Sequence, residues 1–165
     1  MKTILIVYRI LTFLLLPVAA ILGLVDISLL LLALSNPSAL LPAFAIACIV
    51  IYVFTSLSFL VMGILGGRQC KPSLRDWIRV NAFVSIAFGG LTVIEYITLL
   101  NNKTFASELI KQAMQQPGIP PNMTAASLEQ ILLSFLFFFF IFSVLLIIHI
   151  LISFRLLKQF NYLFK

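Results

Sequence analysis

Charged residues are scarce in this chain. They make up 10% of its 165 residues, whereas a soluble globular domain typically carries about 25%. Hydrophobic residues make up 62%, and one small core cannot remove that much apolar surface from water. Lipid can solvate such a surface, so the composition excludes an ordinary soluble domain. We expect a single integral membrane domain that covers residues 1–165.

Cysteine and histidine are also rare, with two cysteines and one histidine. Cys48 lies in an apolar run and Cys70 in a basic loop, roughly 30 Å apart along a helix, which is too far for a disulfide. The absence of a CxxC motif argues against thiol-redox chemistry. The sequence also has no set of metal ligands, no glycine-rich phosphate loop and no nucleophile elbow. We therefore assign no metal site, no cofactor and no catalytic residue.

Most of the chain lies in four long apolar runs, which cover residues 4–34, 39–65, 77–100 and 128–157. A helix needs about 20 apolar residues to cross a bilayer, so each run is long enough. Turn and capping residues between the runs predict helices at 4–34, 38–66, 74–100 and 124–158. We expect an all-α membrane protein whose four transmembrane helices form two antiparallel hairpins.

The connections between the runs carry start signals for helices. Asn36 is placed to cap the second helix, with Pro37 at its first position. The only substantial loop is the predicted outer loop 101–123, and residues 104–116 within it show an apolar stripe at helical spacing. That stripe predicts a short amphipathic helix lying at the membrane interface. Thr124 is then expected to cap the fourth helix.

The basic residues are distributed asymmetrically about these helices. Nine of the eleven lie before the first helix or in its first turns, around the loop between the second and third helices, or in the last turns of the fourth helix and beyond it. They are Lys2, Arg9, Arg68, Lys71, Arg75, Arg79, Arg155, Lys158 and Lys165. Because cytoplasmic ends carry an excess of Lys and Arg, both termini are predicted to be cytoplasmic, in a bacterial inner membrane or a plasma membrane. The net charge of +6 then reflects orientation, and we expect the lipid bilayer and not a nucleic acid as the partner.

Two acids lie inside apolar sequence, Asp26 in the first predicted helix and Glu95 in the third. Charges at bilayer depth are costly and by default suggest a functional site. Helical rise places both near the outer ends of their helices. Glu95 shares one helix face with Asn81, Ser85 and Thr92. The two acids either face each other and bind a cation or a proton, or they are structural acids that hydrogen-bond to helix ends and hydroxyls.

His149 lies about two turns before Arg155, which places it in the predicted inner leaflet at a depth similar to that of Asn81. It is either a hydrogen-bonded packing residue or a ligand or base. The candidate binding residues are therefore Asp26, Glu95, Asn81, Thr92 and His149. The candidate headgroup contacts are Arg68, Lys71, Arg75 and Arg79. Tyr8, Trp77, Tyr96 and Tyr162 lie near predicted helix ends, where amphipathic aromatic rings are common.

Three functions fit this pattern. The first is a non-enzymatic membrane protein that binds other membrane components, as an accessory subunit of a complex or as a homo-oligomer. The second is a small transporter or channel that uses Asp26 and Glu95. The third is a lipid-modifying membrane enzyme, which requires a pocket near the inner leaflet that holds His149, Asn81 and either Arg75 or Arg79.

Overall fold

The computed structural model describes residues 2–114 and 124–164, and these residues form helices without a β-strand. The α-helices are α1 (Lys2–Ala33), α2 (Leu40–Ser58), α3 (Pro72–Asn101), α4 (Lys103–Met114) and α5 (Ala125–Gln159). Four spans are long and apolar enough to cross a membrane, namely Lys2–Ala33, Pro37–Leu65, Pro72–Asn101 and Ala125–Gln159. The prediction of an all-helical chain with four helices long and apolar enough to span a membrane is confirmed.

The chain divides into two compact units. The first comprises Met1–Phe88 and Leu145–Lys165, and the second comprises Gly89–Val144. The boundaries fall inside α3 and α5, so each of these helices contributes residues to both units. The division does not test the expectation of a single domain, which stays a prediction.

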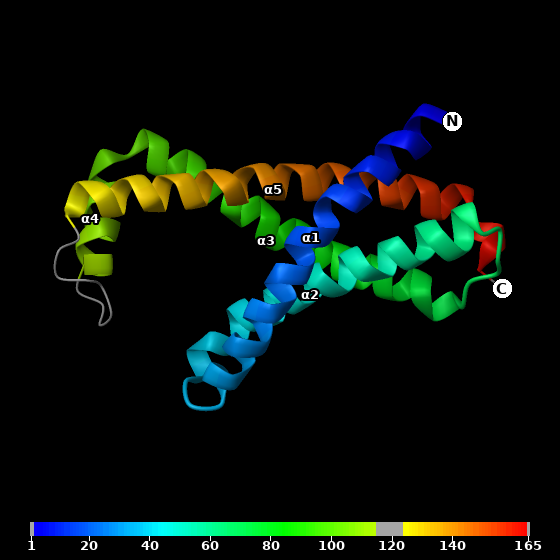
Figure 1. Ribbon diagram of the computed structural model, residues 1–165, viewed down its shortest axis with the longest axis horizontal. Coiled ribbons are helices and arrows are strands. Elements are labelled where there is room, and N and C mark those ends of the chain that lie inside the picture. Colours follow the sequence, from blue (N-terminus) through cyan, green and yellow to red (C-terminus); the bar gives the residue numbers. More distant parts are fainter. Residues whose placement is uncertain (1, 115–123, 165) are drawn as a thin grey trace. The chain divides into compact units, whose positions relative to one another are not determined.

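In the first unit, α1 packs against α2 across a tight turn (Figure 1). The carboxamide oxygen of Asn36 accepts hydrogen bonds from the backbone N–H of Ser38 at 3.2 Å and from its hydroxyl at 2.7 Å. Pro37 begins a 3-10 turn, η1 (Pro37–Ala39), which leads into α2. The predicted cap at Asn36 is therefore confirmed, although the first turn is 3-10 rather than α-helical.

The second span ends in a π-helical segment, η2 (Phe59–Leu65), that continues α2. Gly67 follows with φ of 61°, a left-handed conformation that glycine adopts without steric cost. Its backbone N–H donates to the carbonyl of Gly63 at 3.0 Å, and the N–H of Arg68 donates to that of Met62 at 3.1 Å. These bonds satisfy carbonyls that a helix end otherwise leaves unpaired.

The C-terminal segment packs on the loop that follows η2. The backbone N–H of Cys70 donates to the carbonyl of Leu163 at 2.8 Å, in the short 3-10 helix η3 (Asn161–Leu163). Arg75 donates from Nη1 to Oδ1 of Asn161 at 2.9 Å. The ring of Phe164 stacks on Phe59 with centroids 5.4 Å apart. These contacts fix the loop between the second and third spans against the end of the chain.

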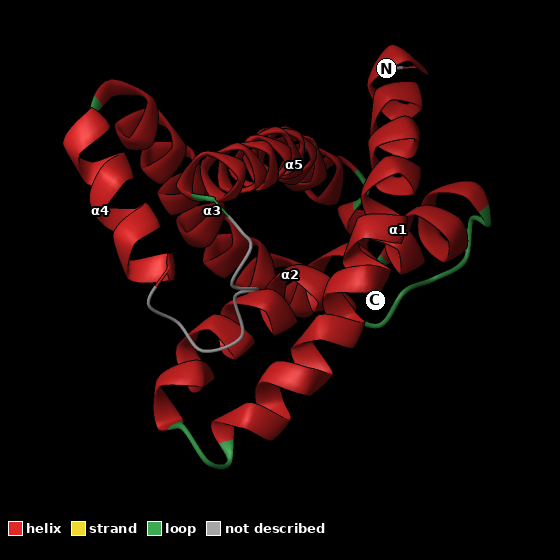
Figure 2. Cartoon of the chain, turned by 60° about the vertical axis from the view of Figure 1, so that its left-hand side comes forward, coloured by secondary structure: helices red, strands yellow, loops and turns green. Residues whose placement is uncertain are grey.

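The second unit contains the carboxyl end of α3, α4 and the amino end of α5 (Figure 2). The Tyr96 ring stacks on Phe140 with centroids 4.8 Å apart. Thr124 and Ser127 form a reciprocal cap for α5, because each backbone N–H donates to the hydroxyl of the other at 3.1–3.2 Å. The predicted cap at Thr124 is thus confirmed. Residues 115–123, which include part of the predicted outer loop, lie outside the described residues.

Candidate functional site

Three helices of the first unit bring fully buried polar side chains together. Each helix supplies two of them at positions i and i+4, which lie on one face of a helix. The pairs are Tyr8 and Thr12 from α1, Tyr52 and Ser56 from α2, and His149 and Ser153 from α5. We call these six residues the polar cluster.

His149 lies at the centre of the polar cluster and is bonded through both ring nitrogens. Its Nε2 lies 2.9 Å from the hydroxyl of Thr12, and its Nδ1 lies 2.7 Å from the hydroxyl of Tyr52. Tyr8 stacks flat on the imidazole, with centroids 4.6 Å apart and planes 8° apart. Tyr52 approaches the same ring edge-on at 5.6 Å. The imidazole is therefore enclosed by α1 and α2.

The hydroxyl groups extend these contacts to the remaining members. Ser153 lies 2.8 Å from the Tyr52 hydroxyl and 3.3 Å from that of Tyr8. Tyr8 donates in turn to the carbonyl of Ser56 at 3.4 Å. Thr12 donates to the carbonyl of Tyr8 at 2.8 Å.

Counting donors and acceptors assigns the histidine proton to Nε2. With the proton there, Nε2–H donates to Thr12, the Thr12 hydroxyl donates to its own helix, and Tyr52 donates to Nδ1. In this arrangement, the long 3.3 Å contact between Ser153 and Tyr8 is the only one of these contacts that is not a hydrogen bond. The other neutral tautomer loses the 2.8 Å bond from Thr12 instead. The shorter bonds favour the first arrangement.

This geometry favours a packing role for His149 over a role as ligand or base. A general base needs a free nitrogen within reach of its substrate, whereas both nitrogens here are occupied and the residue is 0% exposed. In a membrane interior, paired polar groups join helices because the alternative is an unsatisfied group in hydrocarbon. The polar cluster therefore holds α1, α2 and α5 in one register.

Asn81 and Arg75, which were predicted to form an enzyme site with His149, have recorded contacts outside the polar cluster. Asn81 is buried, and its Nδ2 donates to the carbonyl of Trp77 on its own helix at 2.8 Å. Arg75 contacts Asn161, and Arg79 is exposed on α3. The contacts recorded for His149, by comparison, are with α1, α2 and Ser153. No observation favours the enzyme over the other two functions.

The polar face predicted on α3 changes character along the helix. Asn81 and Ser85 are buried in the first unit, and the Ser85 hydroxyl has no hydrogen-bond partner among the described residues. Thr92 is half-buried and Glu95 is exposed, and both belong to the second unit. The amino end of this polar face is therefore buried within the first unit.

The two predicted acids have different environments. Asp26 is 7% exposed on α1, and its Oδ1 has no hydrogen-bond partner in the part of the chain that the structure describes. Glu95 is exposed on α3. They belong to different units, so their predicted pairing stays a prediction.

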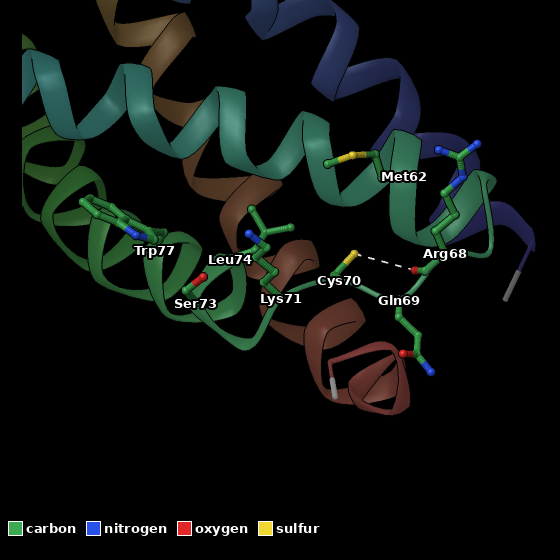
Figure 3. A pocket seen from close by; sticks show the side chains of 8 residues that line it. All are labelled: Met62, Arg68, Gln69, Cys70, Lys71, Ser73, Leu74 and Trp77. Carbon is green, nitrogen blue, oxygen red and sulfur yellow. Dashed lines mark hydrogen bonds between the residues drawn. The ribbon is translucent and has the colours of Figure 1, made fainter.

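A pocket of about 400 Å³ lies between η2 and the start of α3 (Figure 3). Its lining includes two of the four predicted headgroup contacts, Arg68 and Lys71. The full lining is Met62, Arg68, Gln69, Cys70, Lys71, Ser73, Leu74 and Trp77. We call this space the basic pocket.

Burial raises the pKa of the Cys70 thiol, which therefore stays protonated at neutral pH.

Sequence reasoning identified His149 but not the partners that enclose it. Tyr8 was expected at a helix end as an interfacial aromatic, and instead it is fully buried in the polar cluster. The signal that could have found these partners is the recurrence of polar residues at i and i+4 within three apolar runs.

Comparison of the chain with models of known families, with curated proteins and with solved structures returned no match.

Proposed function

We propose that this chain is a multi-pass membrane protein that acts by binding other membrane proteins, as an accessory subunit of a complex or as a homo-oligomer. In this proposal its four spans form two antiparallel hairpins with both termini in the cytoplasm. The positions of nine basic residues on one side of the spans support that orientation. The helix α4 then lies at the outer interface, as its amphipathic sequence suggests.

The observation that carries the proposal is the internal pairing of the polar cluster. Its hydrogen-bonding groups are directed at one another, so they serve cohesion between helices. The surface that remains for function is the outer surface of the helices. Large apolar side chains cover that surface, for example Leu24 and Leu31 on α1 and Phe83 on α3. Such faces are solvated by lipid and pack equally well against another transmembrane helix.

Extraction of the protein in polymer-bounded native nanodiscs tests this proposal. The nanodiscs keep the surrounding membrane, and light scattering combined with mass spectrometry gives the protein mass and composition of each disc. We expect a stoichiometric second polypeptide or a second copy of this chain. A single copy without any companion protein, across several extraction conditions, would contradict the proposal.

The alternative function, a small transporter or channel that uses Asp26 and Glu95, is favoured by one observation. A buried carboxylate oxygen without a hydrogen-bond partner is costly, so Asp26 is a position where a bound cation or proton would bring stabilisation. The test is ion or proton flux into vesicles that contain the purified protein. Flux that Asp26→Asn abolishes, and that Asp76→Asn leaves intact, would establish this function, because Asp76 is an exposed acid on α3.

A further inference from the structure

The lining of the basic pocket combines apolar side chains with positively charged ones. Met62 from η2 and Leu74 and Trp77 from α3 supply apolar surface, and Arg68 and Lys71 supply positive charge (Figure 3). Its volume of about 400 Å³ falls in the range typical of small-molecule sites, about 300–1,000 Å³. The pocket therefore suits an amphipathic ligand with a negative group.

Among the described residues, no recorded ion pair neutralises the positive charge of the pocket. The ion pair recorded within residues 2–114 and 124–164 joins Arg75 to Asp76 at 3.6 Å, and Arg68 and Lys71 are not paired with an acid there. The pocket also lies at the amino end of α3, where the helix dipole adds partial positive charge. An anion in the pocket would balance this charge.

The backbone that carries the two basic residues is held in place on both sides. Gly67, in its left-handed conformation, precedes Arg68, and the backbone of Cys70 is bonded to Leu163 just before Lys71. A Cβ added at Gly63 would lie 3.1 Å from the sulfur of Cys70, so this loop packs closely on η2. A fixed backbone limits the entropy that is lost when a ligand binds.

The exposure of Trp77 favours a lipid over a soluble anion as the ligand of the basic pocket. It is 55% exposed although it is large and apolar, and tryptophan concentrates at the level of lipid headgroups. The loop is on the basic side of the four spans, which faces the leaflet rich in anionic lipid when the termini are cytoplasmic. We propose that the basic pocket binds an anionic phospholipid, with its headgroup attracted by the charges of Lys71 and Arg68 and its glycerol and first acyl carbons against Met62, Leu74 and Trp77.

This site does not depend on whether the chain has a protein partner. Trp77 is the only tryptophan in the chain, so its fluorescence reports on the basic pocket alone. The experiment titrates purified protein in a neutral detergent with phosphatidylglycerol, and separately with phosphatidylcholine and with inorganic phosphate. We expect a saturable change in Trp77 emission with phosphatidylglycerol, at a concentration at least tenfold lower than for phosphatidylcholine.

The variant Arg68→Gln/Lys71→Gln should weaken the phosphatidylglycerol response at least tenfold. The matched control is Arg155→Gln/Lys158→Gln, which removes the same charge from exposed positions near the end of α5 and should leave the response unchanged. The exchange Arg68→Lys/Lys71→Arg keeps the charge and should retain binding, which separates loss of charge from loss of fold.

Three results would overturn the proposal. Equal responses to phosphatidylglycerol and phosphatidylcholine would show that charge does not contribute to recognition. Equal losses in the pocket variant and in the control would show a general electrostatic effect. A saturating response to inorganic phosphate at the same concentration would show a site for a free anion instead of a lipid. The lipid comparison uses the unaltered protein, so it remains decisive even if a variant does not fold.

Discussion

The ring of Tyr8 lies flat on the imidazole of His149, with centroids 4.6 Å apart and planes 8° apart. This contact joins α1, at the start of the chain, to α5, near its end. A stack of this kind brings the two backbones to a fixed separation, and the hydrogen bonds of Thr12 and Tyr52 to the same ring fix its rotation. The fold of the first unit therefore depends on side chains that are far apart in sequence.

Removing the Tyr52 hydroxyl should destabilise the protein. Tyr52→Phe takes away the group that contacts both His149 Nδ1 and Ser153, so Nδ1 loses its recorded partner and Ser153 keeps only the long 3.3 Å contact with Tyr8. We expect a loss of about 1–2 kcal/mol in unfolding free energy. Denaturant unfolding in detergent micelles, followed by circular dichroism, measures it. The same exchange at Tyr162, which is exposed, should change stability little, and equal losses at both positions would contradict the role of the polar cluster.

Gly67 should not tolerate a side chain. Its φ of 61° is unfavourable for other residues, so Gly67→Ala is expected to cost about 1–2 kcal/mol in stability. Gly90→Ala is the matched control, because Gly90 lies within α3 without a positive φ and an added Cβ there meets nothing within 4 Å. That exchange should leave the midpoint of thermal unfolding unchanged or raise it slightly. A greater loss for Gly90→Ala than for Gly67→Ala would refute this reading of the turn.

Cys70 should react slowly with alkylating reagents. Burial raises its pKa, so at any given pH a smaller fraction of the thiol is the reactive thiolate than in an exposed cysteine. The measurement is the maleimide reaction rate against pH in a Cys48→Ala background. A protein whose only thiol is introduced by Ser73→Cys, at an exposed position in the first turn of α3, provides the comparison. The Cys70 rate should still rise at pH values where the comparison rate has levelled, and coincident pH profiles would contradict the prediction.

The predicted orientation places α4 outside the cell and the loop with Cys70 inside it. A membrane-impermeant maleimide applied to intact cells should therefore label Ser107→Cys, whose position is exposed on α4. A cysteine introduced at Ser73 should be labelled only after the membrane is opened. Both experiments use a chain without native cysteines. The reverse pattern of labelling would show that the positive-inside rule has been misapplied to this chain.

Hydropathy was sufficient to predict the four spans, because each apolar run is much longer than a soluble helix requires. The predicted bounds agree with Lys2–Ala33, Pro37–Leu65, Pro72–Asn101 and Ala125–Gln159 to within two residues at each end. The caps at Asn36 and Thr124 were also predictable, since they depend on neighbouring residues only.

Contacts between distant residues were not predictable in this way. His149 was recognised as unusual, but nothing local to α5 indicates that its partners are Thr12 and Tyr52. The π-helical end of the second span likewise contains Gly63, which lies close to the side chain of Leu163, a residue remote in sequence. Periodicity identifies a buried face, whereas the identity of the facing helix depends on the tertiary fold.

In the proposed function, this protein acts through protein contacts on the outer faces of its helices. Photocrosslinking inside the membrane tests it most directly, with a photoreactive amino acid placed at exposed positions such as Leu31 and Phe83 and at the buried position Ile78 as a control. We predict that at least one exposed position gives an adduct with the mass of a second polypeptide, whereas Ile78 gives none. Lipid adducts alone at every exposed position, scanned along all four spans, would contradict the claim.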